Sequence, residues 1–445
     1  MFWGKSVGCP GETFGELVFN TSMTGYQEVL TDPSYRGQVV VMTYPEIGIY
    51  GVNGEDVESE EIQVAGFVVH RAVREPFNYR SSLSFTAYLE QANVVAIEGV
   101  DTRALTRHIR AQGAMRCAIS NLDVEPESLI GRVRQSPSML GRNLVREVSR
   151  RGVVPASCLH SKEMVAQSGP RDECPGEGPA GLCPSPALRV VLVDAGSKAS
   201  IIQNLIQRNA AVTTAPYDAE AQTVLALQPD GVLVSNGPGD PAVLDRTVRL
   251  IRDLLERRVP LAGICLGHQL LGLALGGRTY KMRFGHRGAN HPVKDLVAGR
   301  VLITAQNHGF AIDPTSLDIP WEPVDTAFHP TQAAAPPQSP PQAGERARTF
   351  PPQVGGRAET CPPVPDAEGT MAERLPSRSL IGTSPAGFGP VEITHLSLND
   401  GTLEGLRLHD LPALSVQFHP EASPGPHDAN DFFDAFTTLM EEHRA

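Results

Sequence analysis

Apolar runs of strand length alternate with helix-like segments between residues 188 and 275, and this alternation limits the possible fold more than any other feature. Residues 188–194 and 231–235 are strand-like runs, and the segments that follow them repeat apolar residues at helical spacing. Strands and helices that alternate in this way are typical of a parallel sheet covered on both faces, which binds ligands at the carboxyl ends of its strands. The sequence therefore predicts an α/β domain with a doubly wound, mostly parallel sheet.

A later strand of this series leads into residues 263–269, where Cys265 has glycines close by on both sides and a helix-like apolar run follows. Glycine tolerates the strained backbone of a sharp turn from strand to helix. Such a turn holds the thiol beside the positive end of a helix, which favours the nucleophilic thiolate. We interpret Cys265 as a nucleophile. A buried structural cysteine is the alternative, but flanking glycines are poor core material.

A second reactive group is predicted where the strand-like residues 413–418 run into His419, Pro420 and Glu421. Because proline disfavours a helical conformation in the residue before it, His419 is expected to project from the end of the strand. Glu421 can bind one ring nitrogen and leave the other facing a thiol. A nucleophile, a base and an orienting carboxylate are thus all available. A surface His-Pro turn and a metal site are the alternatives.

Main-chain donors are also predicted, because a thiolate that attacks a carbonyl creates negative charge on its oxygen. Gly237, Pro238 and Gly239 follow the strand at 231–235, and glycine allows this loop to present main-chain amides. The amide of Leu266, directly after the cysteine, is a second source. Taken alone, the loop could be a plain Gly-Pro turn. Its combination with the cysteine and the histidine makes the catalytic interpretation specific.

Composition argues against several classes of protein. The net charge of −12 argues against a nucleic-acid-binding surface, and no apolar run is long enough to cross a bilayer. The first residues lack the pattern of a signal peptide, so a cytoplasmic location is expected. Seven cysteines without C-x-x-C pairing predict neither a disulfide framework nor a structural zinc site. No metal is predicted, since the histidines that could be nominated show no ligand spacing: His268, His286, His291 and His308.

The remaining segments suggest how the chain is divided. Residues 1–148 mix strands and helices without strict alternation, which predicts a smaller α+β domain. Residues 149–187 are polar and contain several glycines and prolines, as linkers do. The α/β domain, at 188–445, is interrupted at about 326–388 by a proline-rich segment that we expect to be disordered. The cost of closing a loop grows only logarithmically with its length, so this insertion need not disturb the catalytic groups.

Three segments resemble the marks of the class I (triad) glutamine amidotransferases, namely residues 235–241, 263–269 and 417–421. Further segments are similar to the small, glutamine-hydrolysing chain of carbamoyl-phosphate synthase, and these are residues 20–28, 30–35, 99–103, 304–310 and 421–426. This second resemblance covers nearly the whole chain except the linker and the insertion. It is specific because other amidotransferases lack the N-terminal domain. Members of the family usually begin with an extra strand, which we expect to be missing here.

The resemblance implies a glutaminase subunit that delivers ammonia to a large, ATP-using synthetase subunit. That partner would make carbamoyl phosphate from bicarbonate for arginine and pyrimidine synthesis. By matching motif, Cys265 would form a glutamyl thioester, His419 would relay protons and Glu421 would orient His419. The residues implied in the same way to bind L-glutamine are Ser34, Gly237, Gly239, Leu266, Gln269, Asn307, Gly309 and Phe310. No cofactor is implied in this chain, which has no Gly-x-x-x-x-Gly-Lys-Ser/Thr loop, and ATP and Mg²⁺ are expected on the large subunit.

Two other functions stay open at this point. One is a triad amidotransferase that serves a different synthase, for nucleotides or anthranilate, and the N-terminal domain argues against it. The other is a non-catalytic regulatory subunit, which is typical of chains that have lost a triad member. All three members are present here, so the sequence favours the enzyme.

Overall fold

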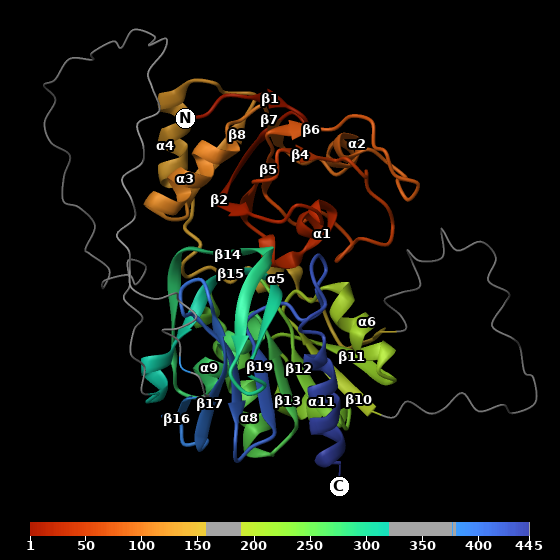
Figure 1. Cartoon of the computed structure of the whole chain (residues 1–445), viewed down its shortest axis with the longest axis vertical. Helices are drawn as coiled ribbons and strands as arrows, with labels where there is room; N and C mark the ends of the chain where they lie inside the picture. Colours follow the sequence, from red (N-terminus) through yellow and green to blue (C-terminus); the bar gives the residue numbers. More distant parts are fainter. Residues whose placement is uncertain (157–187, 320–375, 377–379, 445) are drawn as a thin grey trace, which may run out of the picture.

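The structure is a computed structural model that describes residues 1–156, 188–319, 376 and 380–444, and it contains two domains (Figure 1). The N-terminal domain lies above the larger C-terminal domain in the view of Figure 1, and the strands β14 and β15 reach up towards it. Among the described residues, no helix has both the length and the apolar character needed to cross a membrane.

A six-stranded mixed sheet forms the N-terminal domain, in the order β1-β7-β5-β3-β2-β8. The four inner strands are parallel, and the two edge strands are antiparallel to their neighbours. Every residue of the central strand β3 is buried, and apolar clusters cover both faces. The predicted mixed α+β character is confirmed. The strands of the whole N-terminal domain, in and outside this sheet, are β1 (Lys5–Ser6), β2 (Glu12–Asn20), β3 (Gln38–Met42), β4 (Glu46–Ile47), β5 (Gly66–Val68), β6 (Arg71–Ala72), β7 (Ala96–Glu98) and β8 (Met115–Ser120). Its helices are α1 (Tyr26–Thr31), η1 (Pro33–Tyr35), α2 (Phe85–Gln91), α3 (Thr102–Gln112), α4 (Pro126–Gln135) and α5 (Val145–Val148).

The C-terminal domain contains an eleven-stranded sheet whose centre is parallel, in the order β11-β10-β12-β13-β19. Helices α8 and α9 cover one face and helices α6 and α11 the other, which confirms the doubly wound α/β prediction. Beyond β19 the sheet continues into antiparallel strands that the sequence did not assign to it. The strands are β9 (Val154–Pro155), β10 (Leu188–Asp194), β11 (Ala210–Pro216), β12 (Gly231–Val234), β13 (Leu261–Ile264), β14 (Arg278–Asp295), β15 (Arg300–Asp313), β16 (Leu380–Thr383), β17 (Pro390–Ser397), β18 (Leu403–Leu408) and β19 (Ala413–Val416). The helices are α6 (Ala199–Gln207), α7 (Ala221–Ala226), η4 (Pro241–Val243), α8 (Asp245–Glu256), α9 (Leu266–Ala274), η5 (Pro314–Leu317) and α11 (Asp431–Glu442).

Two boundaries differ from the sequence prediction. Strand β9 belongs to the predicted linker, yet it pairs with β11 at the edge of the sheet. Strand β16 belongs to the predicted insertion at 326–388, yet it pairs with β17. Strand β9 has only two residues and pairs with a strand far along the chain, whereas β16 pairs with the next strand and has one buried residue, so neither has a clear apolar pattern of its own. The rest of the predicted linker and insertion lies outside the described residues.

Polar contacts join the two domains. The ammonium of Lys281 on β14 lies 2.7 Å from a carboxylate oxygen of Glu16 on β2. The buried carboxylate of Glu58 accepts hydrogen bonds of 3.1 and 2.9 Å from the main chain and the hydroxyl of Ser200 on α6. Because a buried carboxylate is costly without such partners, these contacts fix how the domains sit against each other.

Candidate active site

Cys265 lies at a sharp turn between β13 and α9, as the sequence predicts. Its backbone angles, φ 54° and ψ −101°, are strained for a residue with a side chain, and only 2% of its surface is exposed. Strand β12 allows no larger residue than glycine at position 267 of α9, where a Cβ atom would lie 2.1 Å from the carbonyl oxygen of Val234. The turn therefore packs α9 directly against the neighbouring strand β12 and holds the thiol in a fixed position.

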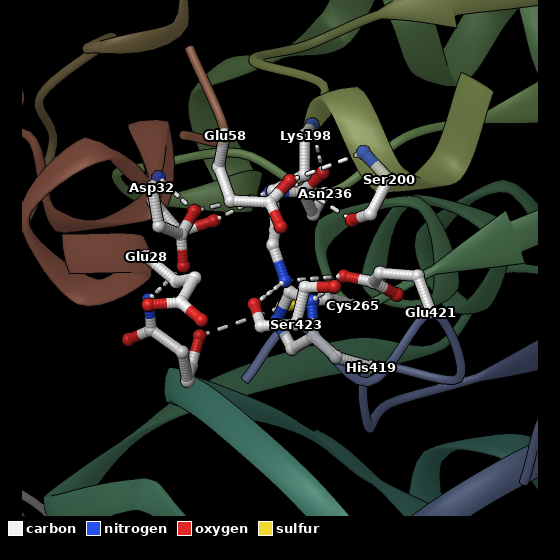
Figure 2. Close-up of polar contacts among 12 residues, drawn as sticks. Glu28, Asp32, Glu58, Lys198, Ser200, Asn236, Cys265, His419, Glu421 and Ser423 are labelled. Atoms are coloured by element: carbon white, nitrogen blue, oxygen red, sulfur yellow. Dashed lines mark hydrogen bonds and ion pairs between the residues drawn. The ribbon is translucent and has the colours of Figure 1, made fainter. Parts of the chain in front are cut away.

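His419 and Glu421 follow the end of β19 and lie beside Cys265 (Figure 2). The ring Nδ1 of His419 is 2.6 Å from Oε1 of Glu421, and its main-chain N–H donates to the carbonyl of Ala305 at 2.9 Å. Among the described residues, the other ring nitrogen, Nε2, has no hydrogen-bond partner. The structure thus brings the three predicted catalytic residues together with one ring nitrogen oriented by the carboxylate and the other available for chemistry.

Lys198, at the start of α6, is a member of this cluster to which the sequence analysis gave no role. Its ammonium lies 2.9 Å from the same Glu421 oxygen that holds His419, and it also donates to the carbonyl of Ser423. Lys198 and Glu421 are both almost completely buried. Lys198 lies between the end of β10 and the start of α6, and nothing in the local sequence pattern there indicates that its side chain points inward.

The charges in this cluster determine its protonation. Burial by itself raises the pKa of Glu421, but the Lys198 and His419 charges outweigh burial and lower that pKa to about 2. Burial likewise lowers the pKa of His419, but the Glu421 carboxylate and the neighbouring Cys265 raise it to about 10. Near neutral pH the ring is therefore protonated and can donate a proton from Nε2.

The N-terminal domain completes the site through Asp32, which the sequence analysis missed. One carboxylate oxygen of Asp32 accepts a 2.7 Å hydrogen bond from the side-chain amide of Asn307, and the other accepts one of 2.9 Å from the main chain of Ser34. The hydroxyl of Ser34 accepts a 2.8 Å bond from the side chain of Asn236. Asp32 begins the turn η1, so its sequence signal was that of an ordinary cap.

One cavity contains Cys265 and most of the residues predicted to bind glutamine. Those that line it are Ser34, Gly237, Gly239, Gln269, Asn307, Gly309 and Phe310. Leu266 directly follows the cysteine but is not part of this lining. The first amide of a helix has no partner within the helix, so the position of Leu266 still allows its N–H to serve as a donor. Other residues that line the cavity were not predicted, and these are Glu16, Gln38, Met139, Arg287 and His308.

The two predicted amide side chains are already partly engaged. The nitrogen of Gln269 donates to the carbonyl of Phe310 at 2.8 Å and to the side chain of Gln417 at 3.0 Å. The nitrogen of Asn307 donates to Asp32, and its oxygen has no partner among the described residues. Both side chains therefore present oxygen acceptors. Acceptors suit an α-ammonium group such as that of glutamine.

A second cavity lies against His419 and shares Asn307 with the first. It is also lined by Glu28, Lys198 and Ser423, so residues of both domains enclose it. Burial, opposed by a main-chain hydrogen bond, raises the pKa of Glu28 to about 7. His419 therefore faces a second, polar compartment that shares Asn307 with the cysteine cavity.

The fold and the site together define a class I glutamine amidotransferase. A family model described as glutamine amidotransferase class-I matches residues 191–335 and 381–439. A model described as the CPSase domain of the carbamoyl-phosphate synthase small chain matches residues 1–119. The second match lies in the N-terminal domain.

Known relatives make the assignment more specific. The carbamoyl phosphate synthase small chain of Thermotoga maritima is 52% identical, over 100% of this chain and 96% of the relative. Those of Syntrophotalea carbinolica and Aquifex aeolicus are 43% and 40% identical, over 100% and 99% of this chain and 96% of each relative. The chain belongs to the family of carbamoyl phosphate synthase small chains.

The charge cluster predicts a pH-dependent contribution to stability. Between about pH 4.5 and 6.5, Glu421 is ionised and His419 protonated in the folded and unfolded chain alike, so their attraction contributes fully. The contribution should decline as the pH rises from 6.5 through about 10, the folded pKa of His419, and as it falls from 4.5 towards 2, the folded pKa of Glu421. Urea unfolding of the wild type and of Glu421→Gln across this range measures it. The exposed Glu441→Gln is the control, and a difference independent of pH would contradict the account.

Replacement of Asp32 tests the hydrogen bond between Asp32 of the N-terminal domain and Asn307 of the C-terminal domain. Asparagine at position 32 still caps η1, but its amide would face the donating amide of Asn307. A hydrogen bond to a charged group is worth about 1.5–3 kcal/mol, so kcat/KM for glutamine should fall by about 10- to 100-fold in Asp32→Asn. Steady-state kinetics measure this, with the exposed Asp245→Asn as control. Unchanged kcat/KM would show that Asp32 does not position Asn307.

Proposed function

We propose that the chain is the glutamine-hydrolysing subunit of a carbamoyl-phosphate synthase. The observation that carries this proposal is the linked set Cys265, His419, Glu421 and Lys198, placed beside a cavity to which both domains contribute. The substrate would be L-glutamine. The product, ammonia, would pass to a large synthetase subunit that uses ATP and bicarbonate.

The first half of the reaction forms an acyl-enzyme. The Cys265 thiolate attacks the side-chain carbonyl carbon of glutamine, and amides of Leu266 and of the Gly237–Gly239 loop stabilise the oxyanion. His419 then donates its Nε2 proton to the departing nitrogen as the C–N bond breaks. Ammonia leaves and a glutamyl thioester remains on Cys265.

The second half releases glutamate. Neutral His419 takes a proton from water, whose oxygen attacks the thioester carbonyl. The C–S bond breaks, the thiolate returns and glutamate leaves. Glu421 keeps Nδ1 protonated throughout, and Lys198 keeps Glu421 ionised, so the ring exchanges protons only at Nε2.

Ammonia would leave through the second cavity, because His419 lines that cavity and Asn307 lines both. Its wall includes Glu28 and Ser423. The partner, the ATP and Mg²⁺ bound by it, and a cytoplasmic location are parts of the same proposal and rest on membership of the family. Neither nucleic acid nor a membrane is a proposed partner.

The two alternative functions have less support. If the chain supplied ammonia to a different synthase, the match of residues 1–119 to the small-chain domain would be unexplained. A non-catalytic role does not account for a buried histidine whose free ring nitrogen adjoins a strained cysteine.

Replacement of the nucleophile tests the activity. Cys265→Ser should lower ammonia release from glutamine by at least about 10³-fold, because the poorer nucleophile cannot form the thioester. The matched control is Cys9→Ser, which changes a half-buried cysteine in the N-terminal domain. Purified protein is assayed for ammonia with and without the large subunit. Full activity in Cys265→Ser would exclude the mechanism.

The same variant separates hydrolysis from partnership. A complex of Cys265→Ser with the large subunit should lose glutamine-dependent carbamoyl phosphate synthesis but keep synthesis from added ammonium salt. If the wild-type complex produces no carbamoyl phosphate from glutamine while the isolated chain still releases ammonia, the chain serves a different synthase.

A further inference from the structure

Three strands bring two histidines and a glutamate together in the antiparallel part of the C-terminal sheet. His286 on β14 lies directly opposite His308 on β15, and their rings meet edge to face with centroids 4.9 Å apart. Glu404 on β18 approaches the same point, and all three side chains are buried. The catalytic mechanism uses none of them.

In each histidine, the ring nitrogen that points away from Glu404, here called the outer nitrogen, already has a hydrogen-bond partner; the other is called the inner nitrogen. Nε2 of His286 donates to the carboxylate of Asp400 at 2.8 Å, and Nδ1 of His308 donates to the carbonyl of Phe310 at 2.8 Å. The bond to the Phe310 carbonyl leaves a lone pair on Nε2 of His308, and Nδ1 of His286 has a lone pair whenever that ring is neutral. Histidines that bind metals are oriented in the same way, with the far N–H held by a carboxylate or a carbonyl.

The inner atoms face one another without partners. Nδ1 of His286 lies 3.5 Å from Oε1 of Glu404, and Nε2 of His308 lies 3.9 Å from that oxygen. Among the described residues, none of these three atoms has a hydrogen-bond partner. The other oxygen of Glu404 accepts a 2.9 Å bond from Gln306, so the carboxylate is held in this orientation. Three buried acceptors that converge on one point are costly unless a cation lies between them.

We propose that His286, His308 and Glu404 bind one divalent transition-metal ion, with zinc the best match. Zinc takes nitrogen and carboxylate ligands at about 2.0–2.2 Å, so its tetrahedral ligand atoms lie about 3.3–3.6 Å apart. The three atoms here all lie within 4.8 Å of one another, so they would have to move inward to bind one ion, and water would supply the fourth ligand. Magnesium and calcium prefer oxygen ligands, which two imidazoles do not provide. The sequence analysis rejected a metal because its ligands come from three separate strands and show no spacing.

The role of this ion would be structural. His308 lies between Asn307 and Gly309, which line the cysteine cavity, so an ion at His308 would hold that edge of the cavity in place. No step of glutamine hydrolysis requires it. The competing occupant is a proton on the inner nitrogen of His286. That proton would face Glu404 across a long 3.5 Å contact and would leave His308 unpartnered.

Metal analysis of the wild-type chain tests the proposal directly. After removal of metal with a chelator, the chain should bind about one zinc ion, and cobalt(II) should give the intense visible absorption of a tetrahedral site. Chelation should lower the melting temperature, and zinc should restore it. A metal-free chain that binds neither ion and melts at the same temperature with and without chelator would overturn the proposal.

Variants locate the ion. Glu404→Gln removes one ligand and should weaken zinc binding at least about 100-fold, because even orienting partners of metal ligands contribute 10- to 100-fold. Asp400→Asn alters such an orienting partner and should weaken binding by about 10- to 100-fold. The exposed His443→Gln is the control and should bind zinc as the wild type does. Equal zinc affinity in all three variants, each shown to be folded by circular dichroism, would place the ion elsewhere and reject this site.

Discussion

One buried carboxylate oxygen organises the active site. Oε1 of Glu421 binds both the ring of His419 and the ammonium of Lys198, which come from opposite ends of the C-terminal domain's sequence. A carboxylate removed from water is stable only when its charge is compensated. The paired cations keep Glu421 ionised, and the ionised carboxylate keeps His419 in the protonated form that can donate to the departing nitrogen of glutamine. The orientation and the charge of the catalytic base therefore have the same physical cause.

The N-terminal domain contributes to this arrangement rather than standing apart from it. Asp32 orients Asn307. Glu58 caps the helix that begins after Lys198, since it accepts bonds from Ser200 (Figure 2). Both carboxylates are buried where the domains meet. A shift between the domains would move one wall of the cysteine cavity and the start of α6 together. Such a connection is a physical route by which events in the N-terminal domain can alter catalysis.

The sequence predicted the parts of this structure that depend on local patterns. The sharp turn at Cys265 followed from glycines between a strand and a helix, and the extended approach to His419 from a proline. Lys198, Asp32 and the cluster around Glu404 could not be predicted in this way. Their roles arise from contacts between residues far apart in the chain, and a lysine or aspartate at a helix cap is ordinarily exposed.

The limits of local sequence patterns also explain why β9 and β16 fall inside the predicted linker and insertion. Strand β9 has two residues, too few to show a period, and β16 is a four-residue strand with one buried residue at the end of the proline-rich segment. The parallel centre of the sheet, in contrast, consists of buried apolar runs that need no partner to be recognised. Local sequence patterns therefore reveal which segments prefer to form strands, but they do not reveal which distant segments pair with each other.

Detection of the covalent intermediate tests the central claim most directly. Wild-type chain is mixed with glutamine, quenched with acid during turnover and analysed by mass spectrometry of its peptides. The account predicts a glutamyl group on the peptide that contains Cys265, lost on treatment with hydroxylamine and missing when Cys265 is replaced by serine. Ammonia release without any adduct on Cys265, or with an adduct on another residue, would contradict it.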